Sequence, residues 1–211
     1  MIATSSSSYS LYSRFEKPIL QRRRRRGPRS QLAVLRRSFR SHAAPADGIR
    51  GESRVNASAP ISQEINFSIY CLNIRCLLSK LAEIQFHIER LQPHVIVLQE
   101  TWLDTSIESV NIPNYILVSR RDRSEHSNRG GIAAFAQSDL RNMVCIAKSI
   151  HAERAWHLLH TDVGSIAIVN WYRPGSSPIT HIISFREEYA EHAHEFQSII
   201  VAGDLNIRHR S

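Results

Sequence analysis

The chain has 211 residues, of which 42% are hydrophobic, and it carries a formal net charge of +8 at pH 7. No apolar run approaches the roughly 18 residues that a membrane-spanning helix needs, so we expect no membrane insertion. The charge is unevenly spread, because residues 1–60 hold 13 of the 27 Lys and Arg residues but only 3 of the 19 acids. The positive excess therefore belongs to residues 1–60, and residues 61–211 are slightly acidic.

Residues 1–60 are rich in Ser and Arg and contain the run QRRRRRGPRS, with consecutive arginines at Arg22–Arg26. A segment of this composition buries too little apolar surface to build a core, so we expect it to be disordered. Its arginine run suits a nuclear-import signal, a phosphate-binding arm, an organelle transit peptide or a solvated tail without a role. We expect a nuclear protein, with organelle targeting as the alternative.

The three cysteines, Cys71, Cys76 and Cys145, form neither an even disulfide framework nor a CxxC pair. We expect reduced, mostly buried thiols in an intracellular protein.

From residue 65 the pattern becomes that of a folded domain. Residues 65–73 alternate apolar and polar side chains, which predicts a half-buried strand, and residues 94–100 form a continuous apolar run typical of a strand buried on both faces. Between them Ser79 is a plausible N-cap, and Pro93 follows the end of a predicted helix. The helix is predicted from apolar residues at helical spacing: Leu81, Ile84, Ile88 and Leu91. A strand, a helix and a buried strand indicate a βαβ unit.

Hairpin-like strands follow, with a tight turn at Asp162–Gly164. The predicted strands cover residues 115–121, 130–137, 143–150, 155–162, 165–172 and 198–204. A second helix is expected over Ile182–Phe196, with its acids on the outer side: Glu187, Glu188, Glu191 and Glu195. This order favours an α/β sandwich of two packed, mixed sheets flanked by helices over a doubly wound sheet.

Polar side chains stand where the predicted strands end: Asn73, Glu100, Tyr172, and Asp204 with Asn206. Strand ends share a rim, where sheet enzymes collect their sites. Two carboxylates and two amides are hard oxygen donors that suit Mg²⁺ or Mn²⁺, and phosphate ester hydrolysis is the chemistry that follows. Taken singly, each residue has another explanation as a turn residue, the start of a solvated loop or a packed aromatic side chain.

Five segments occur together in one order: YCLNIRCL, VIVLQETWL, YILVSRRDR with NRGGIAAF, IVNWYRPG and VAGDLNIRH. Across residues 65–209 this order resembles the endonuclease/exonuclease/phosphatase superfamily, and most of all the endonucleases of non-LTR retrotransposons. The resemblance implies a four-layer α/β sandwich and a Mg²⁺- or Mn²⁺-dependent phosphodiesterase that nicks DNA. We expect DNA as the partner, no small-molecule cofactor, and a monomer.

Residue by residue, the resemblance implies that Glu100 binds the metal, helped by Asn73, which also arranges the scissile phosphate. Tyr172 would hydrogen-bond a phosphate oxygen, Asp204 would orient or deprotonate the attacking water, and Asn206 would hold the developing phosphorane. This agrees with the need to neutralise charge on the phosphate oxygens while a carboxylate positions water.

Arg121 and Arg123 are candidate contacts to the nucleic-acid backbone, although a solvated loop explains them equally well. The histidine pairs His157/His160 and His192/His194 lack a third zinc ligand at suitable spacing.

The superfamily resemblance also implies a final segment with a Ser-Asp-His ending, and no such segment follows Asn206; His209 is a local loop residue rather than its counterpart. We therefore expect a C-terminally incomplete domain of weak or no activity. The alternatives are a non-catalytic nucleic-acid binder that relies on residues 1–60, and a phosphatase of the same superfamily.

Overall fold

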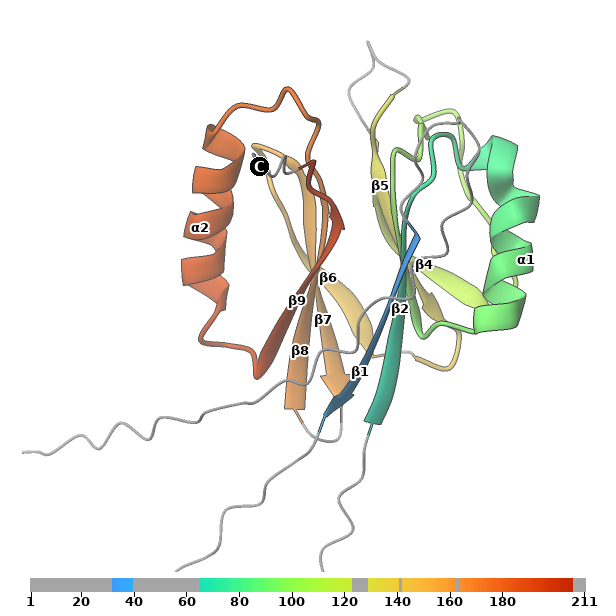
Figure 1. Cartoon of the computed structure of the whole chain (residues 1–211), viewed down its shortest axis with the longest axis horizontal. Helices are drawn as coiled ribbons and strands as arrows, with labels where there is room; N and C mark the ends of the chain where they lie inside the picture. Colours follow the sequence, from blue (N-terminus) through green and yellow to red (C-terminus); the bar gives the residue numbers. More distant parts are fainter. Residues whose placement is uncertain (1–31, 40–64, 123–128, 141, 162–163, 207–211) are drawn as a thin grey trace, which may run out of the picture.

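The computed structural model describes residues 32–39, 65–122, 129–140, 142–161 and 164–206. Within these ranges two β-sheets pack face to face, and one helix covers the outer side of each sheet (Figure 1). The predicted α/β sandwich of two mixed sheets flanked by helices is confirmed.

The first sheet has the strand order β1-β2-β3-β5-β4. Its strands are β1 Leu32–Phe39, β2 Ile65–Asn73, β3 Val95–Gln99, β4 Tyr115–Arg121 and β5 Ile132–Gln137. β2 and β3 are parallel, and the chain between them forms a short 3₁₀ turn, η1 (Leu78–Lys80), and helix α1 (Leu81–Leu91). This is the predicted βαβ unit.

Strand β1 lies inside the segment for which we expected no structure, so that expectation is wrong for its eight residues. β1 pairs antiparallel with β2 along its whole length, from Leu32 opposite Leu72 to Phe39 opposite Ile65. The physical reason is that the edge of β2 offers unpaired backbone groups to a neighbouring strand. The other residues of 1–60 lie outside the described residues.

The second sheet has the order β6-β7-β8-β9. Its strands are β6 Met143–Lys148, β7 Glu153–Thr161, β8 Gly164–Tyr172 and β9 Ser198–Asp204. β7 and β8 form a hairpin in which Thr161 pairs with Gly164; of the turn predicted there, residues 162–163 lie outside the described residues. β8 and β9 are parallel and are joined through helix α2 (Thr180–His192).

Two apolar layers hold the first sheet in place. Between the sheets Ile69 and Val97 pack against Ile168, and beneath α1 Ile84 packs in a cluster with Leu98. β2 contributes side chains to both layers and is buried on both faces. The half-buried strand predicted from the alternation of its sequence is therefore wrong. The alternating polar positions hold small or amphipathic side chains that a core accepts.

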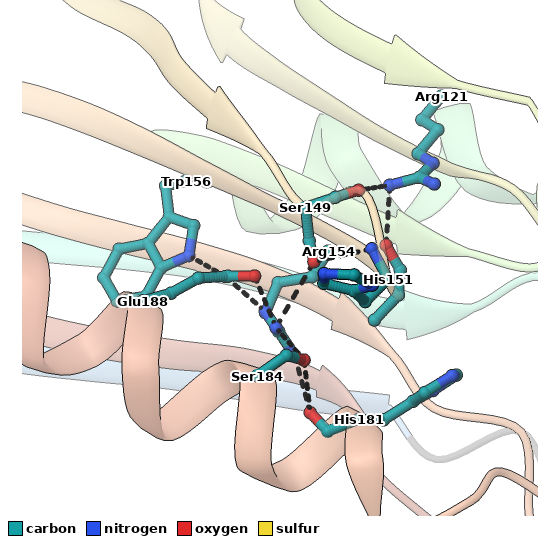
Figure 2. A network of polar contacts seen from close by, with 9 residues as sticks. Arg121, Ser149, His151, Arg154, Trp156, His181, Ser184 and Glu188 are labelled. Atoms are coloured by element: carbon teal, nitrogen blue, oxygen red, sulfur yellow. Dashed lines mark hydrogen bonds and ion pairs between the residues drawn. The ribbon is translucent and has the colours of Figure 1, made fainter.

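Helix α2 is attached to its sheet by polar contacts (Figure 2). The Arg154 guanidinium of β7 is fully buried and donates through Nε and Nη2 to the Glu188 carboxylate, at 2.7 Å each. Trp156 Nε1 donates to the same carboxylate at 2.8 Å. The prediction that all the acids of this helix lie on its outer side is therefore wrong for Glu188, which faces the sheet because it neutralises a buried cation.

Neither helix of the described part of the chain combines the length and the apolar character needed to cross a membrane.

Helix α1 begins without the predicted cap, because the Ser79 hydroxyl donates to the Cys76 carbonyl instead of to the helix.

Candidate active site

The site is built at the carboxyl ends of two pairs of parallel strands. In the first sheet Asn73 stands opposite Gln99, and beyond them Ile74 N–H donates to the Gln99 carbonyl and Cys76 N–H to the Glu100 carbonyl, both at 2.9 Å. The loops after β2 and β3 are thus fastened together by backbone bonds. Glu100 has φ 55°, a left-handed conformation that is strained for a non-glycine residue and is typical of functional positions.

In the second sheet Tyr172 stands opposite Asp204, at the ends of β8 and β9. The residue before Asp204 must be glycine, because a Cβ atom at Gly203 would lie 1.9 Å from the Trp171 carbonyl oxygen. Close backbone approach at Gly203 therefore places Asp204 beside Tyr172.

Two hydrogen bonds join the strand ends of the two sheets. Asn73 Nδ2 donates to Asp204 Oδ2 at 2.8 Å, and the Tyr172 hydroxyl donates to Glu100 Oε1. Four of the predicted site residues, separated by up to 131 positions in the chain, therefore meet on one rim. The carboxyl ends of β2 and β9 lie at the same end of the sandwich, at the top of Figure 1.

Asn206 lies at the exposed border of this group. Its backbone N–H donates to Asp204 Oδ1 at 3.3 Å, and its side-chain amide donates to the Arg173 carbonyl at 2.9 Å. Together with Asn73, Asn206 gives each oxygen of the Asp204 carboxylate a donor, which fixes the orientation of that carboxylate.

The donor set fits a hard divalent cation. An ionised carboxylate only accepts hydrogen bonds, so Asn73 must turn its amide nitrogen toward Asp204 and its oxygen Oδ1 the other way. That oxygen is buried, and no donor among the described residues reaches it. A buried amide oxygen without a donor, on the same rim as the Glu100 carboxylate, is a type of ligand that suits Mg²⁺ or Mn²⁺. The described residues contain no cluster of three His, Cys, Asp or Glu side chains, and Mg²⁺ commonly uses only one or two carboxylates.

Three further residues belong to the site and were missed by sequence reasoning. Trp102 Nε1 donates to Glu100 Oε2 at 2.8 Å, so the carboxylate accepts one bond on each oxygen. Gln99 and Asn170 are polar residues buried inside apolar strands, and Gln99 Nε2 donates to Asn170 Oδ1 at 2.8 Å. Their signal was present in the sequence, since a polar residue within a buried run needs a partner.

Of the two arginines predicted to contact nucleic acid, Arg121 makes hydrogen bonds within the protein. Arg121 donates to the backbone carbonyls of Ser149 and Ala152, which ties β4 to the loop between β6 and β7 (Figure 2). Arg123 lies outside the described residues, as does His209. Of the histidines considered for zinc, His157 is buried between the sheets, with Nε2 2.7 Å from the Ser119 hydroxyl and Nδ1 3.1 Å from the Ile168 carbonyl.

No family model matches the sequence, and no curated protein matches it. Among solved structures, the AP endonuclease LMAP from Leishmania major superposes with a TM-score of 0.51 at 18% identity, over 66% of this chain and 55% of that chain. The chain therefore shares the fold of this AP endonuclease. The fold predicted from the five sequence segments is thereby confirmed.

Two other similar structures come from different biological settings. The endonuclease domain of TRAS1, a telomere-specific non-LTR retrotransposon, has a TM-score of 0.47 at 12% identity, over 64% of this chain and 58% of that chain. The 3′-5′ exonuclease NExo from Neisseria meningitidis has a TM-score of 0.48 at 17% identity, over 64% and 56%. The chain therefore spans little more than half the length of each of these proteins.

Proposed function

We propose that this chain carries a divalent-metal phosphodiesterase site at the ends of β2, β3, β8 and β9, and that its substrate is DNA. The observation that supports this most is the meeting of Asn73, Glu100, Tyr172 and Asp204 on one rim, with a buried amide oxygen left unpaired. The motifs favour a nicking endonuclease of retrotransposon type. We propose a monomer that acts in the nucleus.

Glu100 and Asn73 are the residues that would hold Mg²⁺ or Mn²⁺, through a carboxylate oxygen and Oδ1. When bound, the ion supplies Lewis-acid stabilisation of negative charge on the phosphate oxygens. The lone pairs that remain on Glu100, beyond those used by Tyr172 and Trp102, are enough for this, because a carboxylate offers about four acceptor positions.

The chain's own residues would handle the water and the phosphate. Asp204, oriented by Asn73 and Asn206, takes a proton as a water oxygen bonds to phosphorus. The bond from phosphorus to the sugar oxygen breaks on the opposite side, and that oxygen takes a proton from solvent. The Tyr172 hydroxyl and the Asn206 amide turn from their present acceptors to donate to the non-bridging oxygens.

The test is metal-dependent nicking of supercoiled DNA by the whole 211-residue chain. We expect slow relaxation of the plasmid in Mg²⁺ that falls by at least about 100-fold in Asp204→Ala, the range typical for loss of a general base. The rate should also fall in Glu100→Ala, which loses the proposed metal ligand. Glu187→Ala, an exposed acid on α2, is the matched control and should nick at the wild-type rate. Equal rates in all four proteins would mean that the nicking comes from elsewhere.

The same assay separates the alternatives. A non-catalytic binder would retain DNA without nicking it, lose that binding when residues 1–60 are removed, and bind less tightly as salt rises. A phosphatase would leave the plasmid intact but release inorganic phosphate from nucleotides or lipid headgroups in the same metal.

A further inference from the structure

Gln99 and Asn170 join the two sheets in the middle of the sandwich. Each is only 1% exposed, and Gln99 Nε2 donates to Asn170 Oδ1 at 2.8 Å. Asn170 Nδ2 in turn donates to the carbonyls of Ala133 at 3.0 Å and Leu98 at 3.3 Å. The thiol of Cys71 donates to Gln99 Oε1 at 3.7 Å. One residue of β8 is thus bound to β3 and β5 of the opposite sheet, and through Gln99 to β2.

This pair lies directly beneath the candidate site. Gln99 precedes Glu100 and stands opposite Asn73, whereas Asn170 lies two residues before Tyr172. Because alternate residues of a strand share a face, Asn170 and Tyr172 point to the same side of β8. The bond from Asn170 to Gln99 and the bond from Tyr172 to Glu100 are therefore successive links across the gap between the sheets.

Stability alone does not explain two amides at this depth. A buried amide must recover in hydrogen bonds what it loses in hydration, and two apolar side chains of the same shape would do as well. Close-packed apolar side chains resist sliding, but their attraction has no preferred direction, whereas hydrogen bonds fix distance and direction between individual atoms. The surrounding contact between the sheets is made by aliphatic side chains such as Val97 and Ile168, which set no such direction.

We propose that Gln99 and Asn170 are positioning residues that hold the strand ends of the two sheets in the register at which Asn73 and Glu100 face Tyr172 and Asp204. This rests on the proposed metal site and adds the residues that set its geometry. Neither amide touches the ion or the phosphate.

A second polar link between the sheets provides a matched control. Ser119 of β4 lies 2.7 Å from His157 of β7 through its hydroxyl, and His157 stands opposite Ile168. In the strand order, two strands, β3 and β5, separate the β4 strand of Ser119 from β2, and β4 forms the opposite edge of the first sheet from β1. Removing this link disturbs the interior without touching the strands that carry Asn73 or Glu100.

The experiment measures Tb³⁺ affinity in the whole chain by luminescence sensitised by tryptophan, because Trp102 is hydrogen-bonded to Glu100. The test variant is the double substitution Gln99→Met with Asn170→Leu, which removes both amides at nearly constant volume. We expect its Tb³⁺ affinity to fall by about 10- to 100-fold, the usual effect of losing an outer support of a metal ligand, and Ser119→Ala to stay within about twofold of wild type. Unchanged affinity in a folded double variant would overturn the proposal.

The exchange Gln99→Asn with Asn170→Gln keeps both amides and the total chain length between the sheets, so it should recover most of the affinity. It also decides the matter if the apolar variant does not fold, because an exchanged pair that folds but binds as weakly as Glu100→Ala would contradict a positioning role.

A readout without metal separates this proposal from the proposed function. The side-chain amide of Asn73 donates to Asp204, so one of its ¹⁵N-bound protons should be shifted downfield in the NMR spectrum of the wild-type protein. We expect that shift to collapse in the apolar double variant and to persist in Ser119→Ala. If wild type binds no Tb³⁺ but the Asn73 signal behaves in this way, the metal site is wrong and the positioning role stands. A signal unchanged in the folded double variant would refute the positioning role.

Discussion

The two helices cover equivalent outer faces of the sandwich, but α1 is held by aliphatic packing, whereas α2 combines one packed aromatic side chain with a buried ion pair. Helix α1 buries Ile84 and Ile88 among apolar side chains of the first sheet. Among the described residues of helix α2, Ser184 is the buried one, and Phe185 packs against Trp156 and Trp171 of the sheet. The helix is tied to the same sheet by the Arg154–Glu188 ion pair. The comparison teaches that a helix without a clear apolar stripe can still be specifically attached, provided that a buried charge on the sheet requires its partner.

The largest effect is expected on the α2 side. Glu188→Ala would leave the Arg154 guanidinium buried without a counter-ion and Trp156 Nε1 without its acceptor. We expect the free energy of unfolding to fall by about 3–5 kcal/mol, measured by urea denaturation. Glu187→Ala, on the exposed side of the same helix, should change it by less than about 0.5 kcal/mol. Similar losses in both variants would show that α2 depends on its general acidity and not on this one pair.

The second largest effect is a pH dependence of the free energy of unfolding. We expect it to come from His157, between the sheets, and not from the α2 ion pair. Burial lowers the pKa of His157 from 6.5 to about 4. The imidazole is thus neutral in the folded protein but takes up a proton on unfolding, so its contribution is complete above pH 6.5 and is lost as the pH falls from 6.5 to about 4. This amounts to about 3 kcal/mol in all. Denaturation curves should show this slope in wild type and not in His157→Gln.

The α2 ion pair should persist through that window. Burial works against the ionised form of Glu188, but hydrogen bonds from Arg154, Ser149 and Trp156 outweigh it and hold the pKa of this carboxyl below its usual value of 4.5. Its stabilisation is present above pH 4.5 and is lost only as the pH falls through the lower folded value. An equal pH slope in His157→Gln and wild type would assign the dependence to α2 instead.

The smallest effect is expected on the α1 side. Ile84→Val removes one methylene group from a fully buried side chain, so we expect a loss of about 0.5–1.5 kcal/mol in the free energy of unfolding. The loss should be the same at pH 7 and pH 5, because burial raises the pKa of Tyr70, which belongs to the same cluster, to about 12, far above this range. A pH-dependent loss would mean that the packing of α1 is coupled to the charged groups on the α2 side of the sandwich.

Much of the fold follows from runs of apolar residues. Every strand from β2 to β9 coincides with a predicted segment, because buried strands need continuous or alternating apolar side chains. β1 was missed because Arg36 and Arg37 lie within it, and a pattern cannot show that a neighbouring strand offers backbone partners. The inward side of Glu188 was missed for a similar reason, since its partner Arg154 lies 34 residues away.

The candidate site was predictable only in part. The rim shared by Asn73, Glu100, Tyr172 and Asp204 follows from polar residues at the ends of parallel strands. The link between Gln99 and Asn170 could not be predicted, because it depends on how two sheets face one another across 71 positions. Long-range packing of this kind leaves no periodic signal in a sequence.

The thiol of Cys71 gives the protein a built-in reporter. Burial raises its pKa to about 12, and it lies behind Gln99, whereas Cys76 and Cys145 are partly exposed. Alkylating reagents attack thiolates, so Cys71 would react only in molecules whose strands had parted at this point. The rate at which Cys71 is alkylated thus measures how often the interior between the two sheets opens, without any label being introduced.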